Sequence, residues 1–438
     1  MNETFTQTDL KSEIIQAFRQ FKFPTSQVSR NEAISHFEKL AFPGNKNEEY
    51  RFTPITRSLE KNFSSADFAT TRPSFLTQTD DYRIPGYECN FIVFVNGAYN
   101  KELSVIISPD DQLVIKPLLT AIVEDSGIIN RYFTKLVDSS TDAFAALNTA
   151  FWQSGIFIHI PKNIHLEKPV FILHLHDATL KTVVSQTRVL AVVGDNSEVT
   201  VVEKFNTSGS HPVFNSVVEE IVVQENAALH YHKIQNDAGH FFQVTHTRIH
   251  QSSGSRVNTF TVMLDGQLVR NNLSITIDGE RCESHFYGLY LLHKNTLGDN
   301  HTVVDHTKPN SFSNELYKGI MDGQSRGVFN GKIYVRPQAQ KTNAFQSNRN
   351  ILLSDTSTIN TKPQLEIWAD DVKCSHGCTT GQLDEEALFY LQSRGISKHR
   401  ARALLLYAFA GEILGAIQDQ AVKNYFDTLV SERLQKNI

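Results

Sequence analysis

The chain has 438 residues, 40% of them hydrophobic and 20% charged, which is enough for two or three domains or for one elongated core with additional helices. A net charge of −5, with Lys and Arg scattered along the chain, excludes the concentrated basic surface of a nucleic-acid-binding protein. Apolar runs stay below the roughly 18 residues that a membrane-spanning helix needs, and Asp9, Lys11 and Glu13 stand where a signal peptide would have its apolar stretch. We therefore expect a cytoplasmic protein without a membrane segment.

The first part of the chain, residues 1–151, has mostly helical patterning. Asp9 precedes apolar residues at helical spacing and is a suitable N-cap, and Ser29 opens a capping-box pattern ahead of a second helix. A β-rich run, FIVFVNGAY at 91–99, interrupts this region, and helical patterning returns at 118–137. We predict a mixed, mostly helical N-terminal region that ends near residue 151.

Residues 152–382 change to Val, Ile, Thr, Phe and Tyr in alternation with polar residues, which is the period of two that strands show. Turn-forming residues recur at intervals of about 25 to 31 residues, which is typical of the coils of a β-helix. These turns are Gly194–Asn196, Glu225–Asn226, Ser253–Gly254 and Asp278–Gly279. A two-sheet sandwich, with turns every ~8 to 12 residues, remains the alternative from the pattern alone.

The C-terminal part, residues 383–438, returns to helical patterning. Asp384 is a natural N-cap, Gly395 is placed to end that helix, and Ser397 can cap a second, longer helix. A module this small cannot bury a large core of its own. We therefore expect it to dock on the β core or on a partner.

Cys374, His376 and Cys378 lie within one short segment just before the C-terminal helices. In an extended strand all three would share one face, with neighbours about 6.6 Å apart. The two cysteines would then have Cα atoms about 13 Å apart, beyond the roughly 7 Å that a disulfide allows, and four cysteines in the chain suit a reducing compartment. Thiolate and imidazole bind zinc, copper and iron–sulfur centres. The spacing alone leaves a metal site and a metal-free strand end equally open.

Other motifs favour structural roles. The strand-spaced histidine pairs at 174 and 176 and at 230 and 232 have no Cys beside them in sequence, and HTVVDH at 301–306 can serve turn hydrogen bonds. GVFNGK at 327–332 has the wrong spacing for a phosphate loop and no Ser or Thr after its Lys, so we expect no nucleotide binding. No sequence motif indicates an independent catalytic activity.

Five segments in the second half of the chain are long enough to identify a family: HTVVDH from 301, YKGIMDGQSRGVFNGKIYV from 317, AQKTNAFQSNRNILLS from 339, LEIWADDVKCSHG from 365 and LFYLQSRGIS from 388. They closely resemble the SufB/SufD family, the paralogous scaffold subunits of the SUF system for iron–sulfur cluster assembly. The resemblance runs nearly without interruption from about 300 to 413. It implies a mainly β fold, a right-handed parallel β-helix between N-terminal and C-terminal helical regions.

Two positions favour the SufD branch over the alternative of a SufB-like paralogue. SufB typically carries Glu-His-Glu where this chain has Ser375, His376 and Gly377, and a cluster-binding cysteine where this chain has Asn348. Cys378 departs from the usual SufD pattern, in which Ala is common at that position. The role of this extra thiol is open, and a small packing residue is the simpler interpretation.

The resemblance implies a non-catalytic scaffold subunit that pairs with SufB and holds the SufC ATPase through residues 383–438. A transient iron–sulfur cluster would be shared with SufB, with His376 as the ligand from this chain and Cys374 as a second candidate. The cluster type, the iron and sulfur donors, any flavin, and a homodimer formed without SufB stay open. A β-helix enzyme acting on carbohydrate would need paired carboxylates in a groove and is usually secreted, and a membrane permease would need spanning segments.

Overall fold

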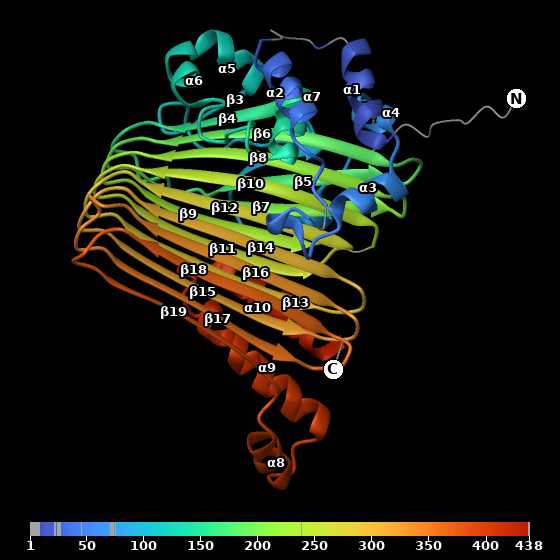
Figure 1. Ribbon diagram of the computed structural model, residues 1–438, viewed down its shortest axis with the longest axis vertical. Helices are drawn as coiled ribbons and strands as arrows, with labels where there is room; N and C mark the ends of the chain where they lie inside the picture. Colours follow the sequence, from blue (N-terminus) through green and yellow to red (C-terminus); the bar gives the residue numbers. More distant parts are fainter. Residues whose placement is uncertain are drawn as a thin grey trace, which may run out of the picture.

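The computed structural model describes residues 9–21, 23, 28–44, 46–70, 74, 76–237 and 239–436. Its body is a parallel β-solenoid of about eight turns with helices at both ends of the chain (Figure 1). Successive strands alternate between two sheets, so each turn contributes one strand to each sheet. The β-helix prediction is thereby confirmed over the sandwich. Among the described helices, none is both long and apolar enough to cross a membrane.

The two sheets stack through the length of the solenoid, and all pairings are parallel except β1 with β2 and β3 with β4. In spatial order the ten-stranded sheet contains β2 (Ala98–Tyr99), β1 (Asn90–Val95), β5 (Val170–Ala178), β7 (Glu198–Gly209), β9 (Ala228–Asn236), β11 (Arg256–Asp265), β13 (Glu283–Leu292), β15 (Phe312–Met321), β17 (Asn343–Leu352) and β19 (Lys373–Gly381). The nine-stranded sheet contains β3 (Val114–Pro117), β4 (Ser154–Ile160), β6 (Val183–Val193), β8 (Val213–Val223), β10 (Phe241–Gln251), β12 (Leu268–Ile277), β14 (Leu297–His306), β16 (Arg326–Val335) and β18 (Thr358–Ile367).

The helices lie outside the solenoid, most of them before β4 and three after β19. They are α1 (Leu10–Gln20), α2 (Val28–Lys39), α3 (Ile55–Asn62), α4 (Ser65–Phe68), α5 (Leu118–Glu124), α6 (Ser126–Tyr132), α7 (Ala143–Phe151), α8 (Glu385–Ser393), α9 (Lys398–Leu414) and α10 (Gln420–Lys436), with 3₁₀ turns η1 (Glu48–Tyr50) and η2 (Asp80–Tyr82).

The turns predicted from the sequence form one corner of the solenoid. Asn163, Asn196 and Asn226 occupy equivalent positions with φ between 56° and 62°, and Gly254 follows with φ 71°. Asn and Gly tolerate this left-handed conformation best. The Asn226 side-chain amide donates to Asn196 Oδ1 at 3.2 Å, and the Asn196 amide donates to Asn163 Oδ1 at 3.0 Å. Stacked side chains therefore hold successive turns in register.

The solenoid interior is mainly Val, Ile, Leu and Phe, but a polar seam runs through it. Near its middle, Lys233 Nζ lies 2.8 Å from Glu219 and 3.2 Å from Glu203, and the Tyr231 hydroxyl oxygen lies 2.6 Å from Glu203 and 2.5 Å from Glu219. All four side chains are at least 97% buried. Buried charges are tolerated when they are paired in this way.

The N-terminal region closes one end of the solenoid and covers part of its nine-stranded sheet. β1 stacks directly on β5, so regular β structure begins before residue 152. Phe63 and Phe144 pack on Phe214 of β8. The predicted Asp9 cap is confirmed by a 2.8 Å bond from the Ser12 amide, whereas the cap predicted at Ser29 is wrong because α2 already includes the preceding residue.

The C-terminal helices divide into a docked part and a projecting part. α10 and the second half of α9 bury Leu406, Ile413, Phe426 and other apolar residues against the outer face of the ten-stranded sheet. Lys318 of β15 joins the sheet to α9, because its Nζ lies 2.6 Å from Glu412 and 2.8 Å from the Phe409 carbonyl oxygen. α8 buries no residue and projects away from the β body (Figure 1). The predicted helix caps at 384 and 397 are confirmed.

Candidate functional site at the open end of the solenoid

The end of the solenoid formed by β18 and β19 is open. β19 is the last strand of the ten-stranded sheet and β18 the last strand of the nine-stranded sheet, and no further strand of the described chain pairs with either. Most β19 residues are exposed, and Trp368, just after β18, is 48% exposed. An uncovered edge of two neighbouring sheets is a template for pairing with another chain.

β19 carries the three residues of the predicted metal segment. It pairs in register with β17, so that Cys374 lies beside Ala344, His376 beside Gln346 and Cys378 beside Asn348. Those three β17 residues are buried and face the solenoid interior. The prediction that Cys374, His376 and Cys378 share one face is therefore confirmed, and that face continues the interior to the open end.

The surroundings of the two thiols differ. Cys374 is half-buried and packs against the apolar interior, and burial raises the pKa of its thiol. Cys378 is exposed, and its Sγ lies 3.0 Å from the Thr361 hydroxyl of β18. Both are free thiols, as predicted, as are Cys89 and Cys282. Cys374 is thus the more buried and Cys378 the more exposed of two thiols on the same face of β19.

The described residues of the open end hold no complete set of metal ligands. In the part of the chain that the structure describes, no three His, Cys, Asp or Glu side chains lie close enough together to hold a metal ion. A metal centre bound by His376 or Cys374 would therefore take its other ligands from a second molecule or from the centre's own bridging sulfur.

The other histidine motifs lie elsewhere. His174 and His176 point into the interior, where their Nε2 atoms lie 2.8 Å from Glu203 and 2.9 Å from Ser185. His232 stacks on Phe260 beneath α10, and His230 lies 3.2 Å from Glu198. GVFNGK is part of β16, so its backbone is extended and cannot wrap a phosphate. None of these four histidines belongs to the open end.

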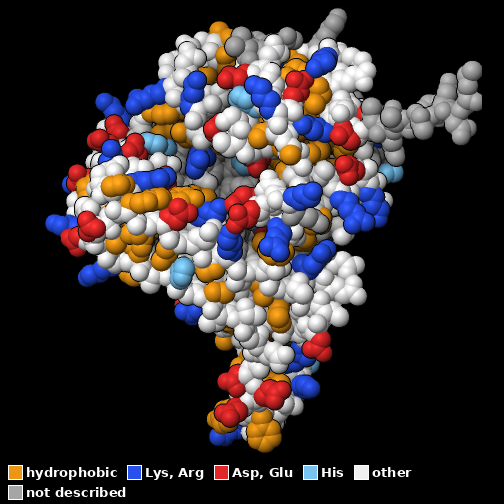
Figure 2. Space-filling model, viewed as in Figure 1, with side chains coloured by type: hydrophobic (Ala, Val, Ile, Leu, Met, Phe, Trp, Pro, Cys, Tyr) orange, Lys and Arg blue, Asp and Glu red, His pale blue; other side chains and the backbone are white. Residues whose placement is uncertain are grey.

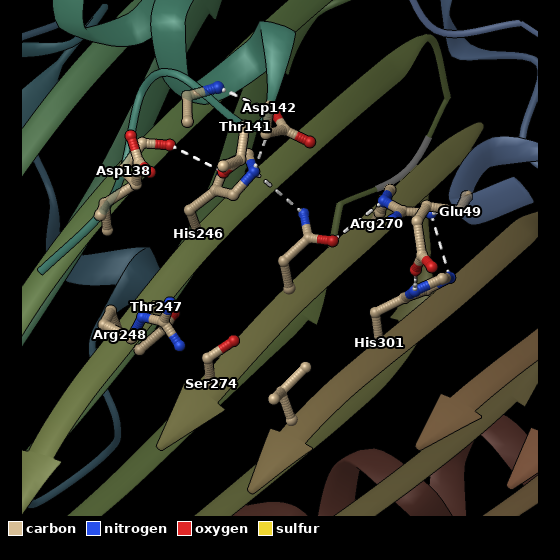
Figure 3. A pocket seen from close by; sticks show the side chains of 14 residues that line it. Glu49, Asp138, Thr141, Asp142, His246, Thr247, Arg248, Arg270, Ser274 and His301 are labelled. Atoms are coloured by element: carbon tan, nitrogen blue, oxygen red, sulfur yellow. Dashed lines mark hydrogen bonds and ion pairs between the residues drawn. The ribbon is translucent and has the colours of Figure 1, made fainter. Parts of the chain in front are cut away.

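HTVVDH contributes to a charged cavity of about 260 Å³ between the N-terminal region and the nine-stranded sheet (Figure 3). His301 lies 3.0 Å from Asp299 and 3.4 Å from Glu49, and Arg270 lies 2.6 Å from Asp299. On the opposite wall His246 lies 3.1 Å from Asp142. Figure 3 shows His246 close to Asp142 in one part of the cavity and Glu49, Arg270 and His301 grouped in another. Residues from 49 to 301 thus form one network, which supports the structural role predicted for the motif.

The electrostatics of this cavity are those of a stable ion-pair network. Hydrogen bonding to His301, supplemented by Lys332, lowers the pKa of the Glu49 carboxyl to about 2 despite partial burial. Burial opposes ionisation of Asp299, but Arg270 and His301 outweigh it and lower the pKa of Asp299 to about 2. Both carboxylates are charged at neutral pH, and the network anchors the N-terminal region to the solenoid.

Sequence reasoning missed two polar residues beneath His376. Gln346 of β17 is its neighbour, and Glu315 of β15 is the next residue inward. Their signal was present in the strand alternation, because each is a polar residue at an interior position. Gln346 and Glu315 therefore join Cys374 and His376 on the inner surface of the open end.

Comparison with known proteins agrees with this architecture. The family model for the SufBD core domain of SUF-system iron–sulfur cluster assembly matches residues 175–409, and that for the SufBD N-terminal region matches residues 1–172. The chain is 33% identical to an iron–sulfur cluster assembly SufBD family protein of Synechocystis, covering 89% of this chain and 86% of that protein.

Two relatives carry the SufD name. The chain is 29% identical to the iron–sulfur cluster assembly protein SufD of Escherichia coli, with 92% of each chain covered. It is 27% identical to SufD of Bacillus subtilis, over 74% of this chain and 75% of that protein. The solenoid, its flanking helices and these matches lead to one conclusion: the chain belongs to the SufBD family of the SUF system for iron–sulfur cluster assembly.

Proposed function

We propose that this protein is the SufD-type scaffold subunit on which, together with SufB, an iron–sulfur cluster is built before it is passed on. One observation carries the proposal: the open end leaves two sheet edges unpaired and places His376 and Cys374 on the inner face between them. The family match supplies the cargo, an iron–sulfur cluster. The role requires no catalytic residue in this chain, since the scaffold holds and releases its cargo.

SufB would pair with the edges of β18 and β19. The central residues of β19, from Cys374 to Thr380, include no Lys, Arg, Asp or Glu, whereas exposed edge strands in monomeric proteins are usually protected by charges. Trp368, whose ring lies beside Tyr334 and Arg336, extends this surface with an exposed aromatic group. A paralogous solenoid end would continue both sheets, and without SufB a second copy of this chain would take its place.

His376 would supply one ligand from this side of the interface, with Cys374 as the second candidate. A neutral imidazole binds iron, as in Rieske centres, and its bond is more labile than that of a thiolate, which suits a centre that must leave. Cys374 is half-buried in a well-packed position, so it would bind only if the cluster approached the interior. Cys378 lies at the rim and contributes little in this proposal.

The projecting C-terminal part would hold the SufC ATPase. α8 exposes Phe389 by 73% and Tyr390 by 57%, and Leu404 and Tyr407 line a groove of about 690 Å³ between α9 and α10. Figure 2 shows this part as a narrow extension with hydrophobic side chains toward its tip. Exposed aromatic side chains on a projecting helix are typical of a partner site.

The cluster role is tested by reconstituting the complex of this chain with SufB and SufC under anaerobic conditions. His376→Ala should leave the complex assembled and reduce its bound iron and sulfide severalfold, because a ligand is lost. Ser375→Ala, on the same strand with its side chain on the opposite face, is the matched control and should load like wild type. A large loss in Cys374→Ser would make that thiolate a second ligand. Wild-type loading of His376→Ala would refute the ligand role.

The SufC role is tested by co-purification. Replacing Phe389 and Tyr390 together by Ala should abolish or strongly weaken SufC capture while SufB pairing persists. Val123→Ala, which removes a 78% exposed apolar side chain from the N-terminal region, serves as the control. Undiminished SufC capture by the double variant would remove the assignment. Deleting all of 384–438 is less informative, because α9 and α10 cover the ten-stranded sheet.

A further inference from the structure

A short polar ladder lies directly behind His376 in the solenoid interior. Glu315, Gln346 and His376 occupy the same register position on β15, β17 and β19. Glu315 is 1% exposed and Gln346 is 3% exposed, so the ladder is buried everywhere except at His376. Adjacent strands are about 4.8 Å apart, which places the Glu315 backbone roughly 10 Å from that of His376.

The contacts fix the orientation of the Gln346 amide. Its Nε2 donates to Glu315 Oε2 at 2.6 Å. Across the interior stands Gly331, and any side chain there would overlap this amide. Because the amide nitrogen is committed to Glu315, the carbonyl oxygen is left as an acceptor. Gln346 Oε1 and Glu315 Oε1 have no hydrogen-bond partner among the described residues.

Among the described residues, no cation pairs with the carboxyl group of Glu315. Its neighbours along the register are Phe286 on β13 and Gln346 on β17, and Thr302 of β14, the register partner of Gly331, faces it. Burial, and to a lesser extent the charge of Glu315, raises the pKa of the Tyr317 hydroxyl on the same strand. Burial raises the pKa of Glu315 to about 7. Burying an acid without a counter-ion reduces the stability of the folded protein, and such destabilising groups are often found at functional sites.

We propose that Gln346 and Glu315 are positioning residues for the cargo site at His376. When the partner closes the open end, the Gln346 carbonyl oxygen accepts the N–H of the His376 ring, and the other ring nitrogen is left with its lone pair toward the iron. Glu315 then supplies a negative charge behind the ring once a cation is bound. Such outer residues set the tautomer and the basicity of a histidine ligand. The inference rests on the proposed function.

The ladder predicts a pH-dependent contribution to iron retention. At a distance of roughly 10 Å and the effective dielectric constant of a protein, an ionised carboxylate raises the affinity of the site for a cation by about tenfold for each unit of positive charge. This contribution is absent when Glu315 is protonated and present when it is ionised. Wild-type complex should therefore hold iron increasingly well between pH 6 and pH 8, beyond the increase due to His376 alone.

The experiment measures iron retained by the assembled complex with SufB and SufC at pH 6 and pH 8, against a competing chelator. Glu315→Gln keeps the shape and the acceptor for Gln346, so it should match wild type within twofold at pH 6 and lose about tenfold at pH 8. Asp237→Asn is the matched control, because burial also raises the pKa of Asp237 to about 7 while its turn after β9 lies far from the open end. This control should follow wild type at both pH values.

A second variant separates orientation from charge. Gln346→Met keeps the length of the side chain but removes the amide, so iron retention should fall severalfold at both pH values. If Glu315→Gln retained as much iron as wild type at pH 8, or Gln346→Met did so at either pH, the positioning role of these two residues would be refuted. If His376→Ala still loses iron in that case, the proposed function stands and only this inference fails. If His376→Ala also retains iron, the ligand role fails with it.

Discussion

The two ends of the solenoid differ in whether other parts of the chain cover them. At the N-terminal end the chain covers itself: β1 and β3 extend the sheets, β2 adds a short antiparallel strand, and helices bury aromatic residues against β8. At the C-terminal end β18 and β19 are left bare, and the next segment, α8, leads away from the body. A solenoid must shield both ends from uncontrolled pairing. This chain covers one end itself, and its described residues leave the other end uncovered.

Two buried acids at the same level of the solenoid are treated differently. Asp299 on β14 is paired with Arg270 and His301 within its own chain and contacts the N-terminal region through Thr53. Glu315 on β15 forms no ion pair among the described residues and is bonded to the amide of Gln346. Both strands are the third from the open end of their sheets, so the difference is between the face that the N-terminal region covers and the interior behind the open end.

The largest effect should come from breaking the buried ion pair between Asp299 and Arg270. Asp299→Ala leaves Arg270, whose side chain is 2% exposed, without its carboxylate, and should cost about 3 to 5 kcal/mol of unfolding free energy. Asp355→Ala at an exposed turn should change it by less than about 0.5 kcal/mol. Urea denaturation of both variants decides the matter. Equal stability of the two would contradict the network's anchoring role.

The docked and projecting C-terminal helices should respond very differently to the same substitution. Phe426→Ala removes a fully buried ring from α10 and should destabilise the protein by about 3 to 5 kcal/mol. Phe389→Ala, on α8, should change stability by less than about 0.5 kcal/mol. Thermal unfolding of the purified chain measures both. A destabilising Phe389→Ala would mean that α8 packs on the body.

Opposite pKa shifts predict opposite pH responses for Asp299 and Glu315. The pKa of Asp299 is about 2, below its usual value, so its contribution to stability is present above pH ~4 and is lost as pH falls toward 2. The pKa of Glu315 is about 7, above its usual value, so its contribution is present below pH ~4.5 and is lost as pH rises through 7.

The Glu315 response can be isolated with its neutral isostere. Relative to wild type, Glu315→Gln should gain stability by up to about 3 kcal/mol between pH 4.5 and pH 8, because the unfavourable ionisation is removed. Urea titrations at a series of pH values give this difference. A constant difference across that range would show that Glu315 ionises freely in the folded protein.

The smallest effect is expected at the rim of the open end. Cys378 is exposed and its thiol touches only Thr361 and, more weakly, Asn348 among described residues. Cys378→Ala should therefore change the free energy of unfolding by less than about 0.5 kcal/mol and leave cluster loading within twofold of wild type. Iron analysis of the reconstituted complex checks the second part. A severalfold loss of bound iron would indicate that Cys378 is a cluster ligand.

Local features of this fold could be predicted from the sequence, whereas long-range pairings could not. The corner turns around Asn196 and Asn226 and the caps at Asp384 and Ser397 follow from residue types within a few positions, and the structure contains them. The association of Glu49 with His301 joins residues 252 positions apart (301 − 49), and nothing in either local sequence indicates it. The docking of α9 and α10 on the ten-stranded sheet is also a long-range contact that the local sequence does not indicate.

The candidate site shows the same division. Strand alternation placed Cys374, His376 and Cys378 on one face, and the register with β17 agrees. Alternation could not reveal that Gln346 and Glu315 lie behind His376, since that depends on which residue of β15 and β17 stands opposite. Register in a solenoid is set by its turns, and a slip of one residue would have turned each side chain to the other face.

Hydrogen exchange compared between the free chain and its complex with SufB tests the asymmetry of the two ends most directly. Protection should rise across β18 and β19, including the amides of residues 373–381, because an edge that was open gains hydrogen bonds. Exchange in β1, β2 and β3 should stay unchanged. Protection gained at β1 to β3, with β19 still exchanging as in the free chain, would contradict the assignment of the open end as the partner face.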